Sequence, residues 1–215
     1  MPTGFGDAVA PRAVLSSSRV FAGHIWDVVT DEVDLGAAGV VHRDYVKHTG
    51  AVVIVALNDA DEIYLVRQYR HPVGVDSWEP PAGLRDVADE PPVDAARREL
   101  HEEADLTAAT WHTLVDYFPS GGGNSEAVRV FLARDLALVP AEERHVRTEE
   151  ERDMVGAWVP LDEVLAAIAQ GRVHASSLVV GAMAADYARR AGGATLRAAD
   201  APWMLPPPDR RRLSS

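Results

Sequence analysis

The sequence predicts an α/β fold, in which a mixed β-sheet lies between helices and a small antiparallel β-sheet is added at the N-terminus. Residues 18–46 alternate apolar and polar side chains, which is the period of half-exposed strands. Residues 51–57 are almost wholly apolar and rich in β-branched side chains, which suits a strand buried on both faces. Residues 93–104 contain no glycine or proline and are mostly good helix formers.

The chain of 215 residues is long enough for one good-sized domain and a small appendage. We expect a loose arm over residues 1–17, an N-terminal strand subdomain over 18–47, a main domain over 48–190 and a peripheral tail over 191–215. Two or three strands do not make an independently stable sheet. The strands of the subdomain should therefore rest on the main domain or on a second subunit.

The composition excludes several classes of protein. The absence of cysteine removes disulfides, thiolate zinc sites and cysteine nucleophiles. A formal net charge of -12 argues against a nucleic-acid surface. No apolar run reaches the roughly 18 residues of a membrane span, and the N-terminus lacks a basic region followed by an apolar core. We therefore expect a cytoplasmic protein whose partner is neither a nucleic acid nor a membrane.

The other elements follow from the apolar pattern in chain order. A returning strand is expected at 62–68, and further strands at 111–118, 127–133 and 155–159, with a glycine-rich loop at 119–126 and a charged surface loop at 136–150. One helix begins within 160–163 and ends near Gln170, and another covers 176–190. The second helix carries apolar residues that we expect to face the core: Leu178, Val179, Ala182, Met183 and Tyr187.

The helix expected at 93–104 carries three carboxylates on one face. Two prolines precede its first turn, and Asp94 can cap it. Glu99, Glu102 and Glu103 stand at i, i+3 and i+4. Clustered carboxylates repel one another unless a cation lies between them, and hard oxygen ligands suit Mg²⁺ or Mn²⁺. Composition alone explains the same residues as a solvated acidic surface, so both interpretations stay open at this point.

A longer pattern around this helix resembles the Nudix box of the Nudix hydrolases. The matching residues are Gly83, Glu90, Arg98, Glu99, Leu100, Glu102, Glu103 and Leu106. Six residues separate Gly83 from Glu90 where the family pattern has five, and Asp105 stands where the family has glycine. A proline-flanked loop can absorb the extra residue. Aspartate tolerates left-handed backbone geometry better than most residues do.

This resemblance implies a Nudix fold and the hydrolysis of a nucleoside diphosphate linked to a second moiety, with Mg²⁺ or Mn²⁺ as cofactor. It implies Glu99 and Glu103 as direct metal ligands. Glu102 is implied as a ligand, or as the immediate neighbour of one, in the catalytic centre. The backbone carbonyl of Ala82 is implied as a further ligand. We expect Arg98 to brace the helix by an ion pair rather than to contact substrate.

The residues before the box resemble the ADP-ribose pyrophosphatase subfamily, which implies ADP-ribose as the substrate. The likeness rests on Trp78-Glu79, on Pro81-Ala82-Gly83 and on Arg67-Gln-Tyr-Arg70. Pro80 replaces the aliphatic residue usual there, and Pro119 lies about two residues before the subfamily's proline marker. The candidate substrate-binding residues are Arg67, Arg70, Glu79 and Trp26, the last as a ring that stacks on adenine. An ordinary surface role for the two arginines, and a core role for Trp26, remain alternatives.

The acidic run Glu149–Met154 resembles the loop that supplies the catalytic glutamate in this subfamily. Glu151 is our first choice as general base and Glu150 the second, with a solvated acidic loop as the alternative. The resemblance also implies a homodimer in which the N-terminal strands of one subunit complete the site of the other. Two other functions stay open, namely a pyrophosphatase for another nucleotide sugar or dinucleotide and a non-catalytic module that senses ADP-ribose.

Overall fold

The computed structural model of the protein describes residues 4–146 and 154–204 and divides into two units. The first unit contains residues 1–50, 118–127 and 202–215, and the second contains residues 51–117 and 128–201. The glycine-rich loop, which we expected inside the main domain, therefore belongs with the N-terminal strands. Glu150 and Glu151, our two choices for the general base, lie outside the described residues.

The first unit is an antiparallel sheet in the order β1-β2-β3, formed by β1 (Ala13–Ala22), β2 (Asp27–Asp34) and β3 (Val40–Lys47). β1 begins five residues before the expected start at residue 18. The earlier start is caused by strand pairing, since Ala13 lies opposite Asp34 and β2 supplies backbone hydrogen-bond partners for these residues. The weak apolar pattern of β1 does not predict this pairing. All ten residues of β1 are exposed.

The second unit contains a mixed sheet in the order β11-β8-β9-β4-β7. The strands are β11 (Arg197–Ala198), β8 (Leu106–Tyr117), β9 (Val128–Leu138), β4 (Ala51–Ala56) and β7 (Ala82–Leu84). β4 runs parallel to β9 and the other pairs are antiparallel. A second, antiparallel sheet has the order β10-β5-β6, from β10 (Val155–Pro160), β5 (Glu62–Arg70) and β6 (Val75–Glu79).

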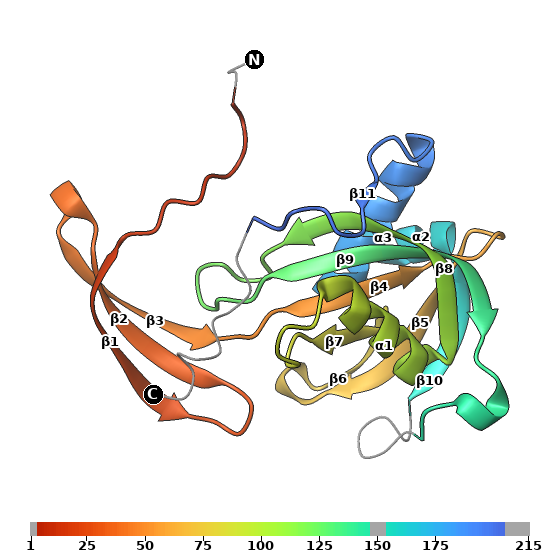
Figure 1. Cartoon of the computed structure of the whole chain (residues 1–215), viewed down its shortest axis with the longest axis horizontal. Coiled ribbons are helices and arrows are strands. Elements are labelled where there is room, and N and C mark those ends of the chain that lie inside the picture. The colour runs from red at the N-terminus through yellow and green to blue at the C-terminus, as the bar shows by residue number, and fades with distance from the viewer. Residues whose placement is uncertain (1–3, 147–153, 205–215) are drawn as a thin grey trace. The chain divides into compact units, whose positions relative to one another are not determined.

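Helices cover both faces of the mixed sheet, as predicted (Figure 1). Among the described residues, the helices are α1 (Pro92–Ala104), α2 (Leu161–Ala169) and α3 (Ser176–Arg190). Val53 and Val55 of β4 belong to the apolar cluster that α2 and α3 share, whereas Val52 and Ile54 belong to the cluster that α1 shares. The expectation that this strand is buried on both faces is therefore confirmed.

The prediction that Met183 and Tyr187 face the core is wrong, because they are 57% and 66% exposed. Leu178 and Ala182 of α3 are fully buried, as expected. Gly181 lets this side of the helix lie close to the sheet, since a Cβ there would meet Val55 at 3.0 Å. The helix therefore packs against the sheet on the side that carries Gly181 and Ala182, and the side that carries Met183 and Tyr187 is exposed to solvent.

The end of the second unit is tied to the sheet, although we expected residues from 191 onward to be peripheral. β11 pairs with β8, and Thr113 Oγ1 donates to the carbonyl of Ala199. The guanidinium of Arg129 is buried, donates to the carbonyl of Ala201 at 2.6 Å and pairs with Asp116 at 2.7 Å. A buried charge needs such partners, and one of them comes from the C-terminal segment.

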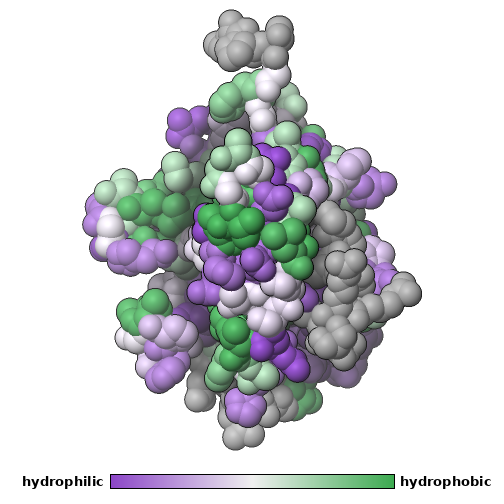
Figure 2. Space-filling view, turned by 90° about the vertical axis from the view of Figure 1, so that its left-hand side faces the viewer, coloured by the Kyte–Doolittle hydropathy of each residue, from purple (hydrophilic) through white to green (hydrophobic). Residues whose placement is uncertain are grey.

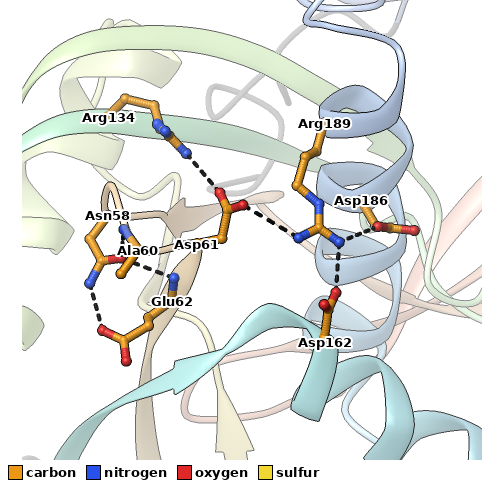
Figure 3. Close-up of polar contacts among 8 residues, drawn as sticks. All are labelled: Asn58, Ala60, Asp61, Glu62, Arg134, Asp162, Asp186 and Arg189. Atoms are coloured by element: carbon orange, nitrogen blue, oxygen red, sulfur yellow. Dashed lines mark hydrogen bonds and ion pairs between the residues drawn. The ribbon is translucent and has the colours of Figure 1, made fainter.

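A cluster of ion pairs joins the turn between β4 and β5 to the end of α3 (Figure 3). Arg189 Nη2 lies 2.6 Å from Asp162 Oδ1 and 2.8 Å from Asp186 Oδ1, and its Nη1 lies 3.4 Å from Asp61 Oδ2. Asp61 has a left-handed φ of 56° and also lies 3.7 Å from Arg134 Nη1. One guanidinium thus links the turn, the start of α2 and the end of α3.

No helix among residues 4–146 and 154–204 combines the length and the apolar character that crossing a membrane requires.

Candidate active site

The residues that flank α1 determine where the helix begins and ends. Pro91 holds the N-cap position with no side-chain cap hydrogen bond, so the prediction that Asp94 caps the helix is wrong. Asp94 instead accepts a hydrogen bond from Arg97 at 2.6 Å. At the other end, Asp105 adopts the left-handed conformation, with φ 52° and ψ 36°. The expectation that aspartate can fill the glycine position of the box is confirmed.

The three carboxylates of α1 differ in exposure. Glu99 and Glu103 are buried, whereas the side chain of Glu102 is 28% exposed. Burial raises the pKa of Glu99, and the charge of Arg98 partly offsets this rise. Arg98 Nη1 lies 2.6 Å from Glu99 Oε1 and 3.2 Å from Glu102 Oε2. The same guanidinium reaches Glu90 at 3.3 Å, so Arg98 braces the box through ion pairs, as expected.

The short strand β7 brings backbone to the buried carboxylates. The amide of Ala82 donates to Glu103 Oε2 at 2.9 Å. A Cβ built on Gly83 would lie 2.0 Å from the Glu99 carboxyl carbon, so a residue without a side chain is required there. The residues that we predicted for the metal are therefore linked in pairs. The Ala82 amide lies beside Glu103, and Arg98 joins Glu99 to Glu102, while Gly83 lies against Glu99.

The chemistry of this donor set fits Mg²⁺ or Mn²⁺. Three carboxylates and a main-chain carbonyl are hard oxygen ligands, which these ions prefer. In the described residues, no three acidic or histidine side chains converge as a ready-made metal cage. Glu99 and Glu103 are nevertheless both buried on α1, four residues apart, and buried carboxylates favour a positive charge near them. In this structure Arg98 places its positive charge beside Glu99 and Glu102.

The arginines of β5 have carboxylate partners across the β5–β6 hairpin. Arg70 makes a two-point contact with Glu79, with Nε–Oε1 at 3.0 Å and Nη2–Oε2 at 2.7 Å. The Glu79 side chain is 9% exposed. Arg67 pairs with Asp76 at 2.7 Å, and about half of each of these two side chains is exposed. Sequence spacing did not reveal these pairs, because β6 was not predicted and the partners lie nine residues apart on facing strands.

Trp26 belongs to the first unit, in the turn between β1 and β2, and is half-buried. Its ring stacks on that of His48, with centroids 4.0 Å apart and an interplanar angle of 21°. Sequence analysis did not reveal this contact. Trp26 directly precedes β2 and His48 directly follows β3, and the pairing of Asp27 with Lys47 in the sheet brings the two residues together.

The comparisons with known proteins agree with this arrangement. The family model described as NUDIX domain matches residues 47–178. The chain belongs to the NUDIX family. The matched segment includes the carboxylates of α1, both arginines of β5 and the strands that hold them.

Two curated relatives that are similar in sequence to this NUDIX chain are named ADP-ribose pyrophosphatase. The protein from Mycobacterium tuberculosis (strain H37Rv) is 41% identical over 190 residues, which cover 88% of this chain and 90% of that one. The protein from Bacillus subtilis (strain 168) is 34% identical over 137 residues, covering 64% and 72%. A solved structure of an ADP compounds hydrolase matches 87% of this chain and 100% of its own with a TM-score of 0.69. At 20% identity, that structure supports the fold alone.

Proposed function

We propose that this NUDIX protein hydrolyses the diphosphate bond of ADP-ribose to give AMP and ribose 5-phosphate. The observation that carries the proposal is the set of carboxylates on α1, held against β7 by Ala82 and Gly83. The names of the two relatives at 41% and 34% identity support ADP-ribose as the substrate.

Glu99, Glu103 and the carbonyl of Ala82 would hold Mg²⁺ or Mn²⁺, with Glu102 as a further ligand or its neighbour. The bound metal supplies neutralisation of the diphosphate charge and acidification of a water. Arg98 balances the negative charges of Glu99 and Glu102, and its ion pair with Glu90 ties α1 to the loop before it. These contacts fix the carboxylates before the substrate arrives, which limits the reorganisation needed during the reaction.

The reaction adds one water across one P–O–P bridge. The water oxygen forms a bond to one phosphorus, and the bond from that phosphorus to the bridging oxygen breaks. The bridging oxygen leaves with its electron pair on the other phosphate. We propose that Glu151 accepts the water's proton, with Glu150 as the second choice. Removal of a general base typically slows a reaction by about 10²–10⁴-fold.

We propose Arg67, Arg70, Glu79 and Trp26 as substrate contacts. Arg67 is about half exposed and paired only with a similarly exposed aspartate among the contacts that the structure gives it, so a phosphate can compete for it at small cost. Arg70 is fixed by a mostly buried carboxylate, so it presents its charge in a defined direction. Glu79 would then act by orienting Arg70.

A Mg²⁺-dependent substrate panel tests the function. We expect AMP release from ADP-ribose to exceed release of nucleotides from other ADP-, UDP- and GDP-sugars. A preference for another nucleotide sugar or for a dinucleotide would identify the protein as a pyrophosphatase for that substrate. Tight ADP-ribose binding without turnover would identify a sensor instead. The variants Glu151→Gln and Glu150→Gln separate the two candidate bases, and turnover that survives both would exclude both residues as the base.

We further propose a homodimer formed through the N-terminal strands, in the cytoplasm. β1 is an edge strand with exposed apolar side chains at Val14, Leu15, Val20 and Phe21. Exposed apolar groups are visible among polar ones in Figure 2. A long exposed edge strand is a template for pairing with a second chain. Light scattering should give twice the chain mass, and Leu15→Glu with Val20→Glu should halve it, whereas Val87→Glu should not.

A further inference from the structure

The side chain and the backbone of Trp26 each make a specific contact within the first unit. On its side chain, the stacked imidazole of His48 lies 4.0 Å away between ring centroids. On its backbone, the carbonyl of Trp26 accepts a hydrogen bond from the amide of Gly23 at 3.0 Å. A Cβ on Gly23 would lie 2.3 Å from that carbonyl oxygen, so the turn closes only around glycine. The indole is therefore placed by specific contacts and not by general burial.

His48 is itself fixed at three points. Its Nδ1 accepts from the amide of Gly50 at 2.9 Å, which puts the ring proton of the neutral form on Nε2. Its own amide donates to Ser125 Oγ at 2.9 Å, and its Nε2 faces Glu126 Oε1 at 3.6 Å. Only 8% of the His48 side chain is exposed. The imidazole thus forms a rigid plate behind Trp26.

The glycine-rich loop carries two of these anchors. It is joined to β3 by hydrogen bonds from the amide of Val46 to Gly123 and from the amide of Ser125 to Val46, both at 3.0 Å. Through Ser125 and Glu126, the loop meets His48 directly. His48 is therefore the residue at which the β1–β2 turn, the glycine-rich loop and the end of β3 converge.

We propose that His48 is a positioning residue that holds the Trp26 ring flat so that its second face can stack on the adenine of the substrate. This rests on the proposed function, which supplies the adenine. A stacked partner covers only one face of an indole, and a nucleobase prefers an aromatic plane that is already ordered, because less side-chain entropy is lost on binding. His48 acts through Trp26 and contacts no reacting atom.

The electrostatics of His48 agree with a packing role. Burial lowers the pKa of His48 to about 4, so the ring is neutral near pH 7. The titratable group that faces it is Glu126, whose pKa burial raises. With a neutral imidazole, the contact at 3.6 Å is a weak polar contact and not an ion pair.

Two variants of His48 separate stacking from hydrogen bonding. His48→Asn offers an acceptor near the Nδ1 position but removes the ring. His48→Phe keeps a ring but removes the hydrogen bond from the Gly50 amide to Nδ1. His24→Asn, at an exposed position in the same turn as Trp26, is the matched control. The wild type and these three variants are compared with Trp26→Phe, so that the difference spectra report Trp26 among the five tryptophans.

The measurements are the near-ultraviolet circular dichroism of Trp26 without ligand, the affinity for AMP and the KM and kcat for ADP-ribose. We expect His48→Asn to lose the Trp26 signal, to weaken AMP binding and raise KM by about 3- to 10-fold, and to change kcat by less than about 2-fold. His48→Phe should stay within about 2-fold of wild type in AMP affinity.

The proposal is overturned if His48→Asn leaves the Trp26 signal or the AMP affinity unchanged. It is also overturned if His48→Phe loses as much affinity as His48→Asn, because the hydrogen bonds would then matter more than the stack. Failure of the wild-type protein to hydrolyse ADP-ribose would contradict the proposed function instead. The AMP titration and the spectra would still decide the role of His48, since neither needs turnover.

Discussion

Gly83 and Glu99 approach so closely that a Cβ on residue 83 would overlap the Glu99 carboxyl group. The contact links β7 to the middle of α1, and it explains why the pattern requires a glycine sixteen residues before a glutamate. The side chain of Glu99 is shielded on this side by backbone, and Arg98 reaches it at 2.6 Å.

Gly83→Ala should therefore displace Glu99 and lower kcat/KM by about 10²-fold, because a misplacement near 1 Å commonly costs that much. The midpoint of thermal unfolding should also fall. Gly6→Ala is the matched control, since a Cβ at Gly6 meets nothing within 4 Å. An activity for Gly83→Ala equal to that of the control would show that Glu99 does not need its observed position.

Glu103→Gln should lower kcat/KM by about 10²–10³-fold and should weaken the rise in unfolding temperature that Mg²⁺ gives the wild type. The reason is the loss of one anionic group from the proposed metal site, while the hydrogen bond to the Ala82 amide can persist. Glu163→Gln on exposed α2 surface serves as the control. Chelation by EDTA should reduce wild-type turnover to background. A Mg²⁺-induced shift that is unchanged in Glu103→Gln would remove this residue from the metal site.

Arg70→Ala and Arg67→Ala should differ in stability. Arg70→Ala leaves the mostly buried Glu79 carboxylate without its two-point partner, so we expect a loss of about 1–3 kcal/mol. Arg67→Ala breaks an exposed pair with Asp76, so the loss should stay below about 1 kcal/mol. Urea unfolding measures both. If Arg67 contacts phosphate, its variant should show an increased KM at nearly unchanged stability, and an unchanged KM would argue for the surface role.

Arg189→Ala should destabilise the second unit by about 1–2 kcal/mol, because three aspartates lose a shared partner. Arg190→Ala is the control, since Arg190 is mostly exposed and pairs with Asp186 at the edge of the cluster. Activity at 25 °C should remain within about 2-fold of wild type in both variants, since the cluster ties α2, α3 and a turn and includes none of the proposed ligands. Equal unfolding midpoints for the two variants would refute the bridging role.

Stability should fall as the pH drops from 7 toward 4, in part because of His48. Its folded pKa, about 4, lies below the ordinary value of 6.5. The unfolded chain therefore binds a proton first, so the stabilising contribution is complete above pH 6.5 and is lost as the pH falls toward 4. His48→Phe cannot titrate and should show a shallower decline than the wild type. Parallel urea midpoints for the two proteins between pH 7 and pH 4.5 would contradict this assignment.

The family pattern, the mixed sheet between helices and the residues of the proposed metal site could all be predicted from the amino-acid sequence. This was possible because the box is local: its carboxylates follow one another on a single helix, and helical periodicity fixes their common face. The left-handed conformation of Asp105 and the doubly buried strand β4 were predictable for the same reason, since each follows from a few neighbouring residues.

Contacts between residues far apart in the chain became visible in the folded structure and could not be predicted from the sequence. The pairing of Arg70 with Glu79 depends on a hairpin whose second strand has little apolar pattern, and the stack of Trp26 on His48 depends on sheet register. Likewise, Met183 and Tyr187 share a helix with buried residues, but the close approach at Gly181 turns them outward. Contacts between distant residues follow from packing and strand pairing, and no local spacing in the sequence encodes them.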